Sequence, residues 1–176
     1  MILIGIDPGS KSGAISVMQT SPDDGVRLLA IHLMPQTEKN IYDLFYEIRQ
    51  QPIRNAIKEL RVNEALFEKE FESVKCILES QHAFPGMGAG AQWTFAQHYG
   101  FLRGVLVALQ IPFIEVAPQT WMGYFGFRRL KDEDKKKHKL RILQKAQNLY
   151  PHSSVALQTA DSLMLCEFLR LLELKN

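Results

Sequence analysis

The stretch Ile2-Leu3-Ile4-Gly5-Ile6-Asp7-Pro8-Gly9 predicts the first strand of the fold and the turn that ends it. A run of isoleucine and leucine that stops at Pro-Gly is typical of a buried strand followed by a turn. With the period of two of a strand, Asp7 shares a face with Leu3 and Gly5, and the isoleucines take the other face. Asp7 has two interpretations with about equal support: an acid that opens the turn, or a functional carboxylate at the end of the strand.

The rest of the chain predicts further strands and helices around this first strand. Two strands follow it through short turns, so the first three strands are expected to form an antiparallel meander. The predicted strands after the first are 13–18, 26–33, 74–79 and 111–116. The predicted helices are 41–71 with an interruption near Pro52, 92–110, a short helix from Pro118, 138–149 and 159–172. This order predicts an α/β fold in which one five-stranded mixed sheet is flanked by helices, with residues 1–176 as a single domain.

The composition is that of an ordinary globular protein. The chain has 176 residues, of which 46% are hydrophobic and 23% charged, and this excludes the disordered, collagen-like and low-complexity classes. Its two cysteines, Cys76 and Cys166, are too few for a disulfide framework, and each lies in an apolar run. We therefore expect buried, reduced thiols. No apolar stretch is long enough for an export signal or a membrane span, so a cytoplasmic protein is expected.

The net charge of +2 conceals an uneven distribution of charged residues. The segment 128–141 contains eight basic side chains and three acidic ones, a net charge of +5. Its basic residues are Arg128, Arg129, Lys131, Lys135, Lys136, Lys137, Lys139 and Arg141. A basic patch of this size indicates a polyanion as partner, the plainer alternative being a solvated surface.

Two further carboxylates occupy unusual positions in the predicted elements. Glu79 ends the fourth strand, where an ordinary surface glutamate is the simpler interpretation unless a partner lies nearby. Asp161 begins a helix whose apolar stripe, Leu165, Phe168 and Leu172, continues on the same face. An acid at the start of such a stripe either caps the helix or points into a shared site.

The three acids converge if the first and fourth strands are neighbours and the last helix packs on them. Like charges so close together need a counter-ion, and a divalent metal is the usual one. Oxygen ligands suit Mg²⁺ or Mn²⁺, and two such ions can activate a water and stabilise both oxygens of a phosphodiester displacement. Together with the basic segment, the acids predict nucleic acid as the substrate.

These residues resemble the acidic motifs of RuvC-type Holliday-junction resolvases, which belong to the RNase H-like (integrase) superfamily. The chain is most similar to the single-domain RuvC-like resolvases of bacteriophages and bacteria, over nearly its whole length and in the same order. The matching stretches are Gly5-Ile6-Asp7-Pro8-Gly9 with Gly13, Ile77-Leu78-Glu79, Gly86-Met87-Gly88-Ala89, Phe95…Tyr99-Gly100…Gly104, Ile111-Pro112…Glu115-Val116…Pro118-Gln119…Trp121 and Ala160-Asp161-Ser162-Leu163.

The resemblance implies an RNase H-like fold and a metal-dependent, structure-selective endonuclease that cleaves four-way DNA junctions. Asp7, Glu79 and Asp161 would be its catalytic metal ligands, for two Mg²⁺ or Mn²⁺ ions. The fourth ligand of the family, an Asp or His one helical turn before the last acid, falls on Gln158, whose amide adds no charge. A homodimer is also implied, since two strands are cut symmetrically across a two-fold junction. Such an enzyme would work on DNA in the cytoplasm of a bacterial or phage-infected cell.

Several residues are candidate DNA contacts. Lys11, in the turn after the first acid, can meet a phosphate, although a plain surface lysine is the more common outcome. Gly86 and Gly88, just past the second acid, allow a DNA backbone to approach closely. Phe84 can stack on bases, and burial in the core is an equal alternative. The Lys and Arg side chains of 128–141 are expected to hold phosphates without reading sequence.

Three alternative functions stay open. Another RNase H-like nuclease would cut branched DNA or RNA–DNA hybrids. A weakly active or inactive junction-binding protein would agree with the neutral Gln158. A fragment of an actin-like sugar kinase also has a first strand that ends in Asp and glycine, but 176 residues leave no room for its second lobe.

Overall fold

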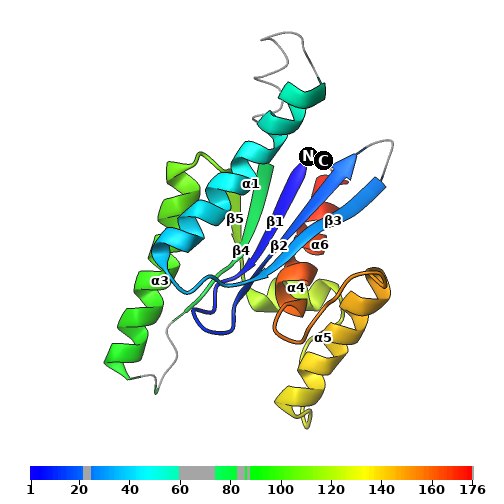
Figure 1. Cartoon of the computed structure of the whole chain (residues 1–176). Helices are drawn as coiled ribbons and strands as arrows, with labels where there is room; N and C mark the ends of the chain where they lie inside the picture. Colours follow the sequence, from blue (N-terminus) through cyan, green and yellow to red (C-terminus); the bar gives the residue numbers. More distant parts are fainter. Residues whose placement is uncertain (22–24, 60–73, 83–85, 87, 176) are drawn as a thin grey trace.

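Five strands form one mixed sheet with helices on both of its faces (Figure 1). The computed structural model describes residues 1–21, 25–59, 74–82, 86 and 88–175, with the backbone alone for 52–59. The strands are β1 (Ile2–Asp7), β2 (Ala14–Ser21), β3 (Gly25–Leu33), β4 (Val74–Glu79) and β5 (Phe113–Val116), in the spatial order β3-β2-β1-β4-β5. β1, β2 and β3 pair antiparallel, whereas β4 pairs parallel with both β1 and β5. The predicted mixed sheet with an antiparallel start is confirmed.

The helices agree with the sequence prediction in order, with some changes of boundary. They are α1 (Glu38–Glu59), α3 (Ala89–Ala108), α4 (Pro118–Tyr124), α5 (Lys135–Leu149) and α6 (Ala160–Glu173). α5 begins at Lys135 rather than at the predicted His138, because Asp134 caps it by accepting the backbone N–H of Lys136 at 2.8 Å. In the part of the chain that the structure describes, no helix is both long and apolar enough to cross a bilayer.

The interruption predicted near Pro52 is wrong. α1 continues through this position to Glu59, and the rest of the predicted helix lies outside the described residues. A proline removes one backbone hydrogen bond, but Ile41, Phe45 and Ile48 of α1 are buried against the sheet. Most of the stability of a protein helix comes from such packing, which here outweighs the local preference.

Each face of the sheet has its own hydrophobic core. Ile2, Ile4 and Ile6 of β1 pack with α1 and α3 on one face. Leu3 points to the other face and packs in a core that α4, α5 and α6 cover (Figure 1). The predicted division of β1 into two faces is therefore confirmed. Both cysteines are buried and free, as expected.

α6 crosses very close to β1, and Gly5 makes this approach possible. A Cβ at position 5 would lie 2.3 Å from the backbone oxygen of Ser162 and 2.5 Å from the backbone nitrogen of Cys166. Two buried polar contacts hold α6 against the sheet: the hydroxyl oxygens of Ser16 in β2 and Ser162 are 2.8 Å apart, and the Cys166 thiol donates to the backbone oxygen of Leu3 in β1 at 3.3 Å. The first turn of α6 is thereby held against the end of β1.

We expect Gly5→Ala to lower the free energy of unfolding by at least ~2 kcal/mol, because the added methyl group meets backbone atoms that cannot move aside easily. Gly90→Ala is the matched control, since a Cβ there has open space and alanine favours helix. Urea unfolding followed by circular dichroism measures both variants. Equal stability of Gly5→Ala and wild type would show that α6 does not depend on this close crossing.

Candidate active site

Asp7 and Glu79 end two neighbouring parallel strands at the same level. In the register of β1 and β4, Ile6 is paired with Leu78, so the next residue of each strand is an acid. Adjacent strands of a sheet lie about 4.8 Å apart. The first and fourth strands are thus neighbours, as the predicted convergence of the acids requires.

Asp161 joins this pair from the first turn of α6. Its side chain is only 7% exposed, and its charge acts on both Asp7 and Glu79. Oδ2 of Asp161 accepts a hydrogen bond from Lys139 of α5, whereas Oδ1 is buried and has no hydrogen-bond partner among the described residues. Thr159 occupies the N-cap position of α6. Of the two open interpretations of Asp161, the structure therefore favours the shared site over the helix cap.

Burial and mutual repulsion shift the proton affinities of the cluster. Burial, followed by the charge of Asp161, raises the pKa of Asp7 to about 6. Burial and then the charge of Asp7 raise the pKa of Glu79 to about 7. For Lys139, burial lowers the pKa, but attraction to the three acids outweighs it, so the pKa lies above its usual value. A cluster of this kind is stabilised by cations.

Two donors orient the carboxylate of Glu79. Trp121 of α4 donates its indole N–H to Oε2 at 2.8 Å, and the side-chain amide of Gln81 donates to Oε1 at 3.2 Å. Trp121 is completely buried, and a buried indole N–H needs an acceptor. The sequence did not predict this contact, although Trp121 belongs to the stretches that carry the family resemblance.

A tight turn holds the backbone of Asp7. The N–H of Gly13 donates to the carbonyl of Gly9 at 2.7 Å, and a Cβ on Gly13 would lie 2.4 Å from the backbone oxygen of Asp7. Lys11 is exposed in the same turn. The glycines following the strand therefore serve to bring the chain back into β2 without displacing the acid.

The basic residues of 128–141 fall into two groups. Most are exposed, namely Arg128, Arg129, Lys131, Lys135, Lys136 and Lys137. Lys139 instead turns to the acids, with its side chain one-third exposed at 33%. Arg141 donates to both carboxylate oxygens of Glu133, at 2.6 and 2.8 Å, and also to the carbonyls of Gly126 and Arg128. Arg141 thus fastens the loop before α5, a role that the sequence did not predict.

The remaining predicted site residues are exposed or lie outside the described part of the chain. Gly86 and Gly88 are exposed, with open space where a side chain would stand, and Phe84 lies outside the described residues. Gln158 is exposed in the turn that precedes α6.

The chemistry of the donor atoms fits a divalent cation. Three carboxylates offer the oxygen ligands that Mg²⁺ and Mn²⁺ prefer, and the buried, unpartnered Oδ1 of Asp161 is an acceptor that calls for a cation or a water. Among the described residues, as their side chains stand, no group of three or more His, Cys, Asp or Glu is arranged to hold a metal ion. The side chains would therefore have to close around an ion, and the cation now in contact with Asp161 is the Lys139 ammonium.

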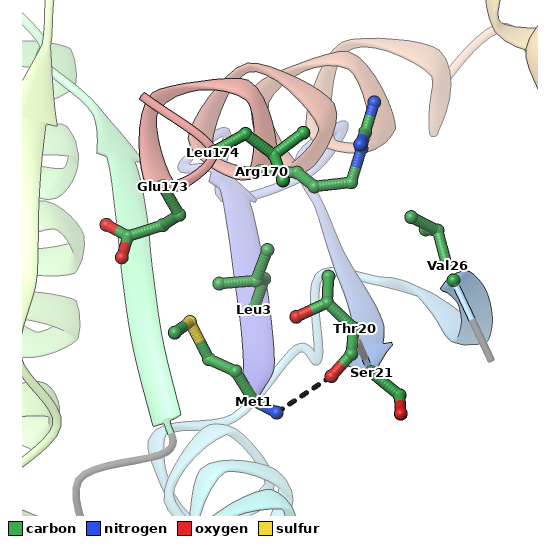
Figure 2. Close-up of a pocket in the computed structure, with 9 residues that line it drawn as sticks. Met1, Leu3, Thr20, Ser21, Val26, Arg170, Glu173 and Leu174 are labelled. Atoms are coloured by element: carbon green, nitrogen blue, oxygen red, sulfur yellow. Dashed lines mark hydrogen bonds between the residues drawn. The ribbon is translucent and has the colours of Figure 1, made fainter. Parts of the chain in front are cut away.

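A cavity of about 690 Å³ lies at the other end of β1, lined by Met1, Leu3 and the end of α6 (Figure 2). Its charged groups already have partners: Glu173 pairs with Lys75, and Arg170 with Glu167. Because the cavity is remote from the acids and its ionic groups are paired, it gives no reason to place a substrate there.

Comparison with known proteins identifies the fold. No protein-family model matches the chain, and no curated protein does. Among solved structures, RuvC of Thermus thermophilus in complex with a Holliday junction substrate is similar with a TM-score of 0.56 and 12% identity, covering 94% of this chain and 90% of that chain. The fowlpox virus resolvase in complex with substrate Holliday junction DNA has a TM-score of 0.52 and 16% identity, over 98% and 99% of the two chains. The chain therefore has the RNase H-like fold of RuvC-type resolvases, which confirms the resemblance at the level of the fold.

Without metal at pH 8, Asp7→Asn is expected to be more stable than wild type, by on the order of 2 kcal/mol. The folded protein raises the pKa of Asp7 from 3.8 to about 6, so the ionised carboxylate costs stability above pH 6, and this cost fades as the pH falls towards 4. Unfolding in EDTA at pH 8 and pH 4 measures the difference. The exposed Asp132→Asn is the control. If Asp7→Asn were no more stable than wild type at pH 8, the ionised Asp7 carboxylate would not cost stability in the folded protein, and the prediction would be wrong.

Proposed function

We propose that this chain is a divalent-metal-dependent endonuclease that cleaves branched DNA, with the four-way junction as its substrate and residues 1–176 as one nuclease domain. The observation that carries the proposal is the meeting of Asp7, Glu79 and Asp161 on the fold of RuvC-type resolvases. Such an enzyme works with DNA in the cytoplasm of a bacterial or phage-infected cell.

In the proposed site, Asp7, Glu79 and Asp161 hold Mg²⁺ or Mn²⁺. When bound, the ion supplies Lewis acidity, which activates water for attack and neutralises charge on the phosphate. The protein orients the ligands: Trp121 and Gln81 each hold one oxygen of Glu79. Because Glu79 and Asp161 are buried, their negative charges act through a medium less polarisable than water and would attract a bound cation more strongly.

The exposed lysines of α5 form a path for the DNA backbone to the acids. Lys135 and Lys136 precede Lys139 by one helical turn and therefore lie on the same side of α5. Lys11, after Asp7, adds a cation on the β1 side of the site. Contacts of this type hold phosphates and position the duplex without selecting a base sequence. Gly86 and Gly88, in the segment that follows Glu79, leave room for a DNA strand.

The proposed enzyme acts as a homodimer through the outer face of α3. This face carries two exposed apolar side chains, Trp93 at 67% and Val107 at 66%. Gly100 and Gly104 lie between them on the same side of the helix, with open space above each, so a second helix can approach closely. Two copies related by a two-fold axis would present two sites to the two symmetric strands of a junction.

The wild-type protein is expected to nick a synthetic four-way junction in Mg²⁺ or Mn²⁺. Asp7→Asn is expected to nick it at least ~100-fold more slowly, because a metal ligand is lost. The exposed Asp132→Asn is the charge-matched control and should retain the wild-type rate. Gel analysis of end-labelled junctions measures both nicking and binding.

The same experiment separates the alternatives. If flap and RNA–DNA hybrid substrates were cleaved as fast as the junction, the substrate would be a broader class of branched or hybrid nucleic acids rather than the four-way junction. Tight, metal-independent junction binding, with wild type and Asp7→Asn equally inert, would contradict the nuclease and leave a junction-binding protein, the alternative that the neutral Gln158 keeps open.

Val107→Glu is expected to convert the dimer into a monomer, because the charge would be buried in the proposed α3 contact. Leu174→Glu is the control, since Leu174 is equally exposed, at 70%, but lies at the end of α6. Sedimentation velocity of the wild type and both variants gives their masses. A monomeric wild type, or a Val107→Glu variant that remains dimeric, would overturn the proposed interface.

A further inference from the structure

Lys139 is the residue of the basic segment whose structural position differs most from its predicted role. A phosphate-binding lysine is expected on the surface, yet the ammonium group of Lys139 forms an ion pair with Asp161, whose side chain is 7% exposed. The ammonium group also attracts, and is attracted by, Asp7 and Glu79. A single lysine thus faces all three acids of the site.

The helix around Lys139 is fixed on both sides of it. His138, the preceding residue, is buried, and its Nε2 lies 2.6 Å from the carbonyl oxygen of Phe127. Ile142 and Ala146, further along α5, are completely buried in the core that α6 shares. Lys139 is therefore held in the site by its helix, unlike the exposed Lys137 two positions earlier.

The oxygens of Asp161 divide between two roles. Oδ2 is taken by Lys139, whereas Oδ1 is buried without a partner among the described residues. One oxygen is therefore left for one additional cation. Position 158, where the resemblance places a further acidic or imidazole ligand, holds an exposed neutral amide. The negative charge of the three acids and the carboxylate oxygens they offer as ligands both suit one divalent ion next to a fixed ammonium group better than two divalent ions.

We propose that Lys139 is a built-in cation of the active site that takes the place of a second divalent metal ion, so that the chain binds a single ion through Asp7, Glu79 and the free oxygen of Asp161. This inference rests on the proposed nuclease function. The ammonium group lies on the α6 side of the cluster and supplies positive charge to a phosphate that enters the site. The protein thereby performs, with a side chain, part of the charge neutralisation that two-metal sites assign to the second ion.

The test combines a metal-binding measurement with a rate. Calorimetric titration of the metal-free wild-type protein with Mn²⁺ is expected to give one ion per chain. Lys139→Met is expected to bind Mn²⁺ at least ~10-fold more tightly, because a positive charge next to the ion is removed. The same variant is expected to nick the junction at least ~100-fold more slowly, because the phosphate loses that charge. Tighter metal binding together with slower cleavage is a combination that a merely structural lysine would not produce.

Two variants serve as controls. Lys137→Met removes an equal charge from the exposed side of α5 and should leave the Mn²⁺ affinity within about twofold, as expected for a screened surface charge. Lys139→Arg keeps the charge and should keep an affinity near that of wild type, which tests the proposal even where Lys139→Met folds poorly.

The outcomes separate this inference from the proposed function. Two Mn²⁺ ions per wild-type chain, or an unchanged affinity in Lys139→Met, would overturn the role of Lys139 while leaving a metal-dependent nuclease. A wild-type protein that neither binds Mn²⁺ nor nicks the junction would overturn the nuclease function, and the role of Lys139 with it.

Discussion

The close crossing of α6 over β1 is the contact on which the site depends. Only a glycine at position 5 allows the backbones near Ser162 and Cys166 to come so near to the strand. This crossing brings the first turn of the last helix to the end of the first strand, so that Asp161 meets Asp7 although they lie far apart in the sequence. The parallel pairing of β1 with β4 then adds Glu79 at the same edge. Two backbone arrangements, rather than any local motif, assemble the three acids.

Bringing these acids together costs free energy, and several contacts in the fold offset part of that cost. Trp121 and Gln81 donate to Glu79, and Lys139 pairs with Asp161. The pKa values of Asp7 and Glu79 stay above their usual range, first because of burial and then because of the neighbouring acids, so these partners compensate only part of the cost. A site that retains such repulsion in the folded protein is ready for a cation, which is a usual property of functional sites.

The sequence predicted the parts of this structure that follow from local patterns. The alternation along β1 correctly separated Leu3 and Gly5 from the isoleucines, and the stripe on α6 correctly placed Asp161 on the buried side. Contacts between distant segments were not predictable in the same way. The lysines of 128–141 look alike in sequence, and which of them turns inward depends on the docking of α5 through His138 and Ile142. The interruption of α1 near Pro52 was wrongly predicted because tertiary packing overrides a local preference.

In the proposed function, Asp7, Glu79 and Asp161 form one metal-binding site at the ends of β1 and β4. A crystal of the protein soaked in Mn²⁺, with anomalous scattering measured near the manganese edge, tests it most directly. We expect an anomalous peak within coordination distance of carboxylate oxygens of all three residues. A fully occupied manganese elsewhere, with Lys139 still on Asp161 and no peak among the three acids, would contradict it.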